Sequence, residues 1–276
     1  MLRTRRIVSV ALVLVVFSGS ATAAASSRSA ASGNPRAFST SNTKYVASAV
    51  YDVLGRKATA ADNARWVGPL DAGGTRSEFA SQLVKTPERA AIVTNALYNA
   101  VLLRSPDAAG LAYWTAKLAS GYRSANLAAA LYASDEFYDG AGGTVDSYVK
   151  VVYVSVLERP ADDAGLAYWT KRINAGTPRS SIARTFYLSR ESNARRARTI
   201  YLHLLLRPPT SADLKTWSQA LITQDDGVLI ARLVASDEYY VWSQKRPSVG
   251  STTTVVVPPK PTSTSTSTTS TTLRHV

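Results

Sequence analysis

Cysteine is absent from the 276 residues of the chain, and histidine occurs only as His203 and His275. Without cysteine there is no disulfide, no thiolate metal ligand, no cysteine nucleophile and no lipid-modified N-terminal cysteine. A lone histidine beside leucines on a helix is more often a packed residue than a catalyst, because acid–base catalysis needs a partner group. Sequence patterns of phosphate-binding loops, zinc proteases and serine hydrolases are also missing. We therefore expect no catalytic residue, no metal site and no cofactor.

The chain also lacks an apolar run long enough to cross a membrane. Its main apolar run covers residues 7–17, after three arginines among the first six residues. As a helix rising ~1.5 Å per residue, this run is too short for a ~30 Å hydrocarbon layer. Residues 21–23 then give the small-x-small pattern that precedes a cleavage site. Residues 1–23 are thus predicted to be a signal peptide of a secreted or cell-envelope protein that has no transmembrane helix.

Large apolar residues are scarce at both ends of what remains. Residues 24–43 consist mainly of Ala, Ser, Thr and Gly, and residues 247–276 are rich in Ser, Thr and Pro. Such compositions cannot bury enough apolar surface to offset the entropy of ordering the chain. We expect residues 24–43 to be a disordered linker and residues 247–276 to be a disordered tail, of a composition typical of O-glycosylated stalks.

Between these ends one motif occurs four times. Every copy has an arginine ten residues before a tryptophan, and the pairs are Arg56 and Trp66, Arg104 and Trp114, Arg159 and Trp169, and Arg207 and Trp217. Self-similarity of this kind is typical of stacked helical repeats. The outer copies depart most from the shared pattern, as terminal capping repeats do.

Each copy predicts three helices. Apolar residues spaced three and four apart form one stripe before each arginine, and another stripe follows each tryptophan. Helix-capping residues stand three residues after each arginine, at Thr59, Asp107, Asp162 and Thr210. A last helix in each copy ends at a hydroxyl residue (Thr86, Ser134, Ser189 or Ser236), and a glutamate follows two residues later (Glu88, Glu136, Glu191 or Glu238).

These patterns predict an all-α fold of four tandem three-helix repeats. Seven extra residues, rich in glycine, separate the second copy from the third. We therefore predict a Gly-rich hinge at residues 139–147. It would divide the chain into repeats one and two (44–138) and repeats three and four (148–246). We expect the two repeats on each side of the hinge to pair with one another.

The fullest copy of the motif consists of Arg104, Pro106, Asp107, Gly110, Leu111, Tyr113 and Trp114, followed by Ser134, Glu136 and Phe137. This motif resembles that of the bacterial domain of unknown function 4214 family, a helical module of secreted and envelope-associated proteins. The resemblance covers the two middle copies well and the outer two loosely. Because no activity is established for that family, the resemblance implies the fold and export and leaves the function open.

Arginine and glutamate recur together at fixed offsets. We predict that the arginine before each tryptophan pairs with the glutamate of the hydroxyl-x-Glu turn, as in Arg104 with Glu136 and Arg159 with Glu191. Loss of one partner would cost ~3 kcal/mol or more if the pair is buried. The four tryptophans are interpreted as core residues rather than sugar-stacking platforms, and Trp242 as the better candidate for an exposed aromatic.

The chain is strongly basic, with 32 Lys and Arg against 19 Asp and Glu and a net charge of +13. The most uneven stretch contains eight basic residues and one acid; the candidate polyanion-binding residues are Lys171, Arg172, Arg179, Arg184, Arg190, Arg195, Arg196 and Arg198. Such a cluster either binds a polyanion or only keeps the surface soluble. Two acidic stretches with glycine, 139–146 and 224–227, lack the spacing of calcium loops and are interpreted as structural.

The sequence thus favours a non-catalytic binding or scaffolding protein of the bacterial cell envelope. Its expected partners are an anionic envelope polymer, lipid headgroups or another envelope protein, and nucleic acid is not expected. An envelope-active hydrolase acting on polysaccharide is the alternative, since recurring Asp and Glu residues can form pairs of catalytic carboxylates. Their positions at helix starts favour capping instead.

Overall fold

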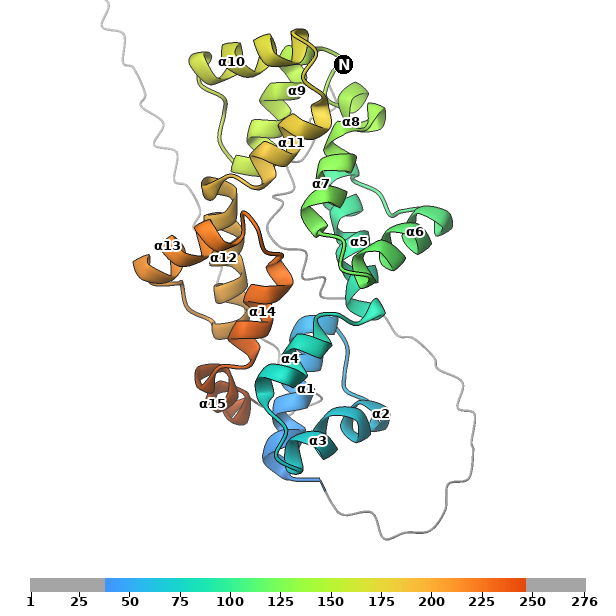
Figure 1. Ribbon diagram of the computed structural model, residues 1–276, viewed down its shortest axis with the longest axis vertical. Coiled ribbons are helices and arrows are strands. Elements are labelled where there is room, and N and C mark those ends of the chain that lie inside the picture. Colours follow the sequence, from blue (N-terminus) through green and yellow to red (C-terminus); the bar gives the residue numbers. More distant parts are fainter. Residues whose placement is uncertain (1–37, 247–276) are drawn as a thin grey trace, which may run out of the picture.

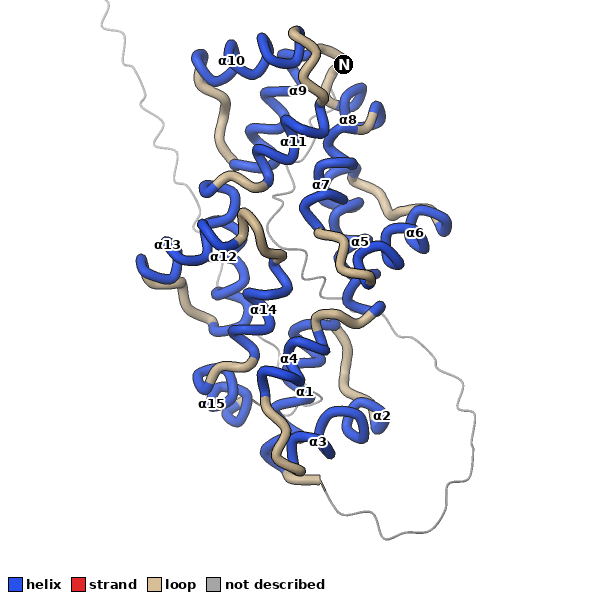
Figure 2. The backbone as a smooth tube through the Cα atoms, viewed as in Figure 1, coloured by secondary structure: helices blue, strands red, loops and turns tan. Residues whose placement is uncertain are grey.

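The computed structural model describes residues 38–246. The predicted signal peptide, most of the predicted linker and the predicted tail lie outside the described residues. Within residues 38–246 every regular element is helical and no strand occurs, which confirms the all-α class (Figure 2). No helix in this range has the length and apolar character that crossing a membrane requires.

The helices follow the four copies of the motif, here called segments 1 to 4. Segment 1 contains α1 (Thr40–Leu54), α2 (Ala60–Asp62), the π-helix η1 (Asn63–Val67), α3 (Gly68–Asp71) and α4 (Arg76–Leu83). Segment 2 contains α5 (Pro87–Leu102), α6 (Ala108–Ala119) and α7 (Ser124–Ala133), and α8 (Asp135–Gly140) follows it. Segment 3 contains α9 (Val145–Val152), the π-helix η2 (Tyr153–Leu157), α10 (Asp163–Asn174) and α11 (Arg179–Tyr187). Segment 4 contains α12 (Arg190–Leu205), α13 (Ser211–Ala220) and α14 (Asp226–Val234), and α15 (Asp237–Lys245) follows it.

The capping residues start the helices as predicted. The side chains of Asp107 and Asp162 accept hydrogen bonds from the backbone N–H groups of Gly110 and Gly165, at 2.7 and 2.8 Å. Thr59 and Thr210 instead form capping boxes with an aspartate three residues later. The hydroxyl residues of the hydroxyl-x-Glu turns cap α5, α8, α12 and α15. Each of these side chains satisfies a backbone donor that the first helical turn leaves free.

Helix α1 begins earlier than the predicted boundary between linker and repeats. The hydroxyl of Ser39 accepts a hydrogen bond from the backbone N–H of Asn42, so the helix begins at Thr40 and not after residue 43. Both residues also donate to the carboxylate of Asp71 at the end of α3. These bonds hold the start of α1 against its own segment.

The buried apolar residues form two cores, and these pair the segments differently from the prediction. Core 1 joins segments 1 and 4, with residues such as Tyr45, Phe79 and Leu229. Core 2 joins segments 2 and 3, with residues such as Leu127 and Ile182. Helix α4 accordingly packs on α14, and α7 packs on α11. The predicted pairing of segment 1 with 2 and of segment 3 with 4 is therefore wrong.

The connections between segments explain this arrangement. Helices α5 and α12 are each 16 residues long, and each carries the chain from one core to the other. The glycine-rich stretch makes a tight turn between α8 and α9, where Phe137 and Tyr138 both pack on Tyr148 inside core 2. It therefore folds segment 3 back onto segment 2 and is not a hinge between two separate cores. Figure 1 shows segment 3 at one end, segment 1 at the other, and segments 2 and 4 side by side between them.

Candidate binding cavity at the centre of the molecule

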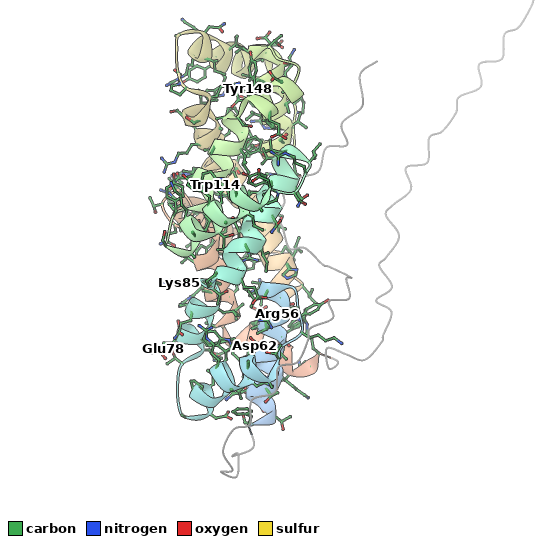
Figure 3. All side chains as sticks on the ribbon, turned by 90° about the vertical axis from the view of Figure 1, so that its right-hand side faces the viewer. Arg56, Asp62, Glu78, Lys85, Trp114 and Tyr148 are labelled. Atoms are coloured by element: carbon green, nitrogen blue, oxygen red, sulfur yellow. The ribbon has the colours of Figure 1, made fainter. Side chains whose placement is uncertain are left out.

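A cavity of about 670 Å³ lies where the two cores meet. Its lining comes from α4, α5, α6, α7, α11, α12 and α14 and from the loops after α4 and α6, so that all four segments contribute to it. This volume is within the range of small-molecule sites, roughly 300–1,000 Å³. Lys85, one of the lining residues, lies near the middle of the long axis, between Glu78 and Trp114 (Figure 3).

One wall of the cavity is apolar. It includes Val93 and Leu97 on α5, Leu118 at the end of α6, Val84 after α4 and Ala231 on α14. Side chains on successive turns of α5 face the same direction, so this helix gives the wall its length. The wall suits the apolar body of a ligand.

The lining also contains a buried ion pair. Arg196 is 5% exposed, and its Nε lies 3.0 Å from Oδ2 of Asp226. Its remaining donors bind the carbonyl of Tyr187, the hydroxyl of Ser192 and the side-chain oxygen of Asn193, at 2.6 to 2.9 Å. Burial raises the pKa of the Asp226 carboxyl, and the charge of Arg196 opposes that rise. Arg196 is thus fully occupied in holding α12 against α14 and α11.

A reciprocal pair of helix caps joins segments 2 and 4 beside the cavity. Arg123 donates from Nη2 to the carbonyls of Leu221, Ile222 and Gln224, at 3.3, 3.1 and 2.9 Å. In return, a carboxylate oxygen of Asp225 accepts from the backbone N–H of Ser124 at 2.7 Å. A cation at a helix C-terminus and an anion at a helix N-terminus both interact favourably with the helix dipole. Both carboxylates of the cavity are therefore used within the protein.

Arg89 differs from Arg196 although both are 5% exposed. Its printed side-chain hydrogen bond runs from Nη1 to the carbonyl of Val53, at 3.0 Å. Its Nε and Nη2 have no hydrogen-bonding partner within residues 38–246. Burial lowers the pKa of the Arg89 guanidinium to about 10, and the charges of Asp226 and Asp225 oppose this fall. A desolvated cation with free donors thus lines the cavity.

The mouth of the cavity is open and carries further positive charge. Lys85 and Arg232 are exposed there, and so are the apolar side chains of Tyr122 and Val228, at 41% and 46%. Positive charge at an entrance attracts anions, and exposed apolar side chains provide contact for an apolar ligand.

The predicted polyanion-binding residues have different surroundings, and one of them is buried. Arg196 is buried in the ion pair described above, so its prediction as a surface residue is wrong. Helical phase explains this, because Arg196 shares a face of α12 with the buried Asn193 and Ile200. Others are engaged locally: Arg172 with Tyr168, Arg179 with Asp135, Arg190 with Gln219, and Arg195 with Glu158. Lys171, Arg184 and Arg198 are exposed.

The motif arginines and glutamates pair in all four copies. Nε of Arg56 lies 2.5 Å from Glu88, that of Arg104 2.6 Å from Glu136, that of Arg159 2.7 Å from Glu191, and that of Arg207 2.5 Å from Glu238. The predicted pairing is confirmed, but the pairs lie at the surface, with both side chains of the Arg104 pair more than 40% exposed. In segment 1 the arginine also binds an aspartate, Asp62, at 2.6 Å, and in segment 3 Arg159 lies 3.8 Å from Asp162.

The aromatic predictions had mixed outcomes. Trp66 is buried in core 1, Trp217 packs against that core, and Trp114 and Trp169 pack against core 2. The prediction that Trp242 is exposed is wrong, because its ring packs on core 1 and the guanidinium of Arg246 lies 3.6 Å from the ring centroid. His203 contacts the carbonyl oxygen of Asp52, at 3.2 Å. No group of three or more potential metal ligands occurs in the part of the chain that the structure describes.

Reasoning from the sequence missed Arg89, the buried lining residue of the cavity with free donors. A signal was present when the four copies are compared. Three residues after the capping hydroxyl, the other copies have Phe137, Ser192 and Tyr239, all buried. A charged residue at a position that is otherwise buried indicates a site with a purpose other than packing.

A family model described as domain of unknown function (DUF4214) matches the chain twice, over residues 77–141 and 128–196. Comparisons with curated proteins and with solved structures found no match. The two matched stretches include α5, α7 and α11 and the N-terminal half of α12, and with them Arg89 and Arg196.

Proposed function

Residues 77–196 belong to the family described as domain of unknown function (DUF4214), and from the geometry of this chain we propose a non-catalytic binding protein whose central cavity holds a small ligand. The observation that carries the proposal is the cavity itself. It has the volume of a ligand site, it lies between two cores, and its lining combines an apolar wall with a buried arginine.

The carboxylates of the cavity support binding rather than hydrolysis. A glycosidase needs two carboxyl groups that are free to exchange protons or attack the substrate. Asp226 is paired with Arg196, and Asp225 accepts backbone hydrogen bonds from Ser124 and Gly227. Neither group is available for catalysis without breaking the contacts that join the two cores.

We further propose that the protein acts in the cell envelope after export. The predicted leader at residues 1–23 supports this. A mature chain that begins at Ala24, found by intact-mass measurement of the protein from its native host, is the expected result. A retained leader would contradict export by this route.

Binding in the cavity is tested with Nile red, a neutral dye whose fluorescence rises in apolar surroundings. We expect saturable binding at one site per chain. Val228→Trp places an indole at the mouth of the cavity and should weaken binding by about tenfold or more, since it removes space for the dye. Val241→Trp is the matched control, because Val241 is 51% exposed, like Val228 at 46%, but lies on α15 away from the cavity.

Equal dye binding by the two tryptophan variants would contradict the proposal, because the dye would then be bound elsewhere. So would the absence of saturable binding to the parent protein. Circular dichroism of both variants shows whether the helices are retained.

A further inference from the structure

We propose that the ligand of the central cavity is an acyl chain that carries one carboxylate, held by Arg89 at the carboxylate and by the wall of α5 along the chain. This inference rests on the proposed function, because it names the chemical class that the same cavity binds.

The two buried arginines of the cavity provide an internal comparison. Arg196 makes five side-chain hydrogen bonds, two of them to Asp226. Arg89 is equally buried and makes one, to a neutral carbonyl. A buried charge without a hydrogen-bonded counterion destabilises a fold, so a ligand anion that pairs with it is favoured. Among the lining residues, Arg89 is such a buried charge without a hydrogen-bonded counterion.

The free edge of Arg89 favours a carboxylate. Nε and Nη2 are adjacent donors on one side of the planar guanidinium, and they match the two oxygens of a carboxylate in a bidentate pair. Each of these donors lacks a partner within the described residues. A bound carboxylate would give Arg89 the anionic partner that Asp226 gives Arg196.

The charge balance of the cavity favours a single negative charge. Four basic side chains and two carboxylates line it, and two of the basic ones, Lys85 and Arg232, are exposed at the mouth. Arg196 and Asp226 neutralise each other, which leaves Arg89 as the deep cation and Asp225 as a nearby anion. A dianionic phosphate would meet Asp225 with an uncompensated charge, whereas a carboxylate is matched by Arg89.

The apolar wall favours a hydrocarbon chain. Val93, Ala96 and Leu97 line the cavity along α5, with Leu118 and Ala231 beside them. None of these side chains offers a hydrogen bond, so a sugar or peptide would leave its polar groups unpaired there. An acyl chain has no polar groups to leave unpaired there, and burial of its methylenes is favourable.

The test uses three probes that share a dodecyl chain and differ in the head group: dodecanoate, dodecanol and dodecyltrimethylammonium. Their binding to the mature protein is measured by calorimetry below the concentrations at which micelles form. We expect dodecanoate to bind one site per chain about tenfold or more tightly than dodecanol, and the cation to bind more weakly than either. Equal affinities for dodecanoate and dodecanol would overturn the inference while leaving the cavity as a binding site.

Substitution of Arg89 locates the anion. Arg89→Met keeps an unbranched stem without the charge, and it should lower dodecanoate affinity to that of dodecanol while dodecanol affinity stays the same. Arg89→Lys should keep a preference for dodecanoate of reduced size, because a lysine lacks the bidentate edge. Arg184→Met is the matched control, since Arg184 is exposed on α11 and does not line the cavity.

Stability of the ligand-free variants separates a binding role from a structural one. Removing a desolvated cation should leave the melting temperature of Arg89→Met equal to or above that of the parent. A lower melting temperature with unchanged dodecanoate affinity would show that Arg89 serves the fold and would overturn the inference. Failure of Nile red, dodecanol and dodecanoate to bind the parent protein would instead overturn the proposed function itself.

Discussion

At the scale of single residues, burial decides what an arginine–carboxylate pair contributes to stability. The Arg104–Glu136 pair is bidentate but largely exposed. Water and salt screen such a pair, so its coupling energy should be below about 1 kcal/mol. A double-mutant cycle of Arg104→Ala and Glu136→Ala, followed by urea unfolding, measures it. A coupling of several kcal/mol would show that the pair is shielded from water.

The Arg196–Asp226 pair should behave in the opposite way. Both side chains are at most 12% exposed. Asp226→Asn leaves Arg196 buried without a counterion, which should lower the free energy of unfolding by about 3 kcal/mol or more. The same urea measurement serves, and Asp139→Asn, at an exposed residue of α8, is a suitable control. A loss below 1 kcal/mol in Asp226→Asn would contradict the role assigned to the pair.

Asp62 predicts a dependence of stability on pH. Hydrogen bonds from Arg56 lower the pKa of Asp62 from 3.8 to about 2. A carboxyl group whose pKa is lower in the folded state stabilises the fold at pH values above its unfolded-state pKa. This stabilisation is lost as the pH falls through the folded-state pKa. At pH 5 the free energy of unfolding of the parent should thus exceed that of Asp62→Asn by about 1–2 kcal/mol. This difference should shrink between about pH 4 and pH 2. Asp163→Asn, at an exposed residue of α10, should show no such change.

At the scale of elements, a tertiary contact with a tyrosine explains the glycine three residues after a capping aspartate. A Cβ on Gly165 would overlap the hydroxyl of Tyr153, and one on Gly110 would lie 3.0 Å from the hydroxyl of Tyr98. Helix propensity alone predicts that Gly165→Ala stabilises α10 by up to about 1 kcal/mol. The overlap predicts a loss of about 1 kcal/mol or more instead. In a Tyr153→Phe background the loss should diminish, and thermal unfolding of the four proteins decides between the two.

The elements themselves could be predicted from the sequence, but their partners could not. Helix starts depend on local bonds, such as that from Gly110 to Asp107, and the sequence shows both members of each. The pairing of cores depends on which third helix packs on which. Leu127, Ile182, Phe79 and Leu229 occupy equivalent apolar positions, so their pattern does not distinguish α7 on α11 from α7 on α4. The cavity was missed for the same reason, since it exists only where the two cores meet.

At the scale of the whole molecule, the ends of the described chain close the structure. Helix α15 packs on α1, where Tyr239 donates a hydrogen bond to the carboxylate of Asp52 at 2.6 Å. Arg246 binds the other oxygen of Asp52 at 2.8 Å. Segments 1 and 4, which are farthest apart in the sequence, are thus joined by a core and by a buried polar cluster.

This closure predicts how the two halves of the chain behave. Residues 38–142 contain one face of each core, and residues 143–246 contain the other two faces. Each half alone would expose side chains that are fully buried in the whole protein, such as Leu127 in one and Ile182 in the other. Neither half should therefore unfold cooperatively by itself, because exposed core surface removes the main source of stability.

Mixed in equal amounts, the two halves should associate one to one and recover both cores. The cavity takes Val84, Arg89 and Val93 from the first half and Arg196 and Ala231 from the second, so binding of Nile red should return with association. Sedimentation, circular dichroism and dye fluorescence follow the recovery, and the parent chain cut between Gly142 and Gly143 is the control. Cooperative unfolding of residues 38–142 alone would contradict this prediction, because it requires a complete core within that half. It would instead support the pairing of segment 1 with segment 2 that the sequence predicted.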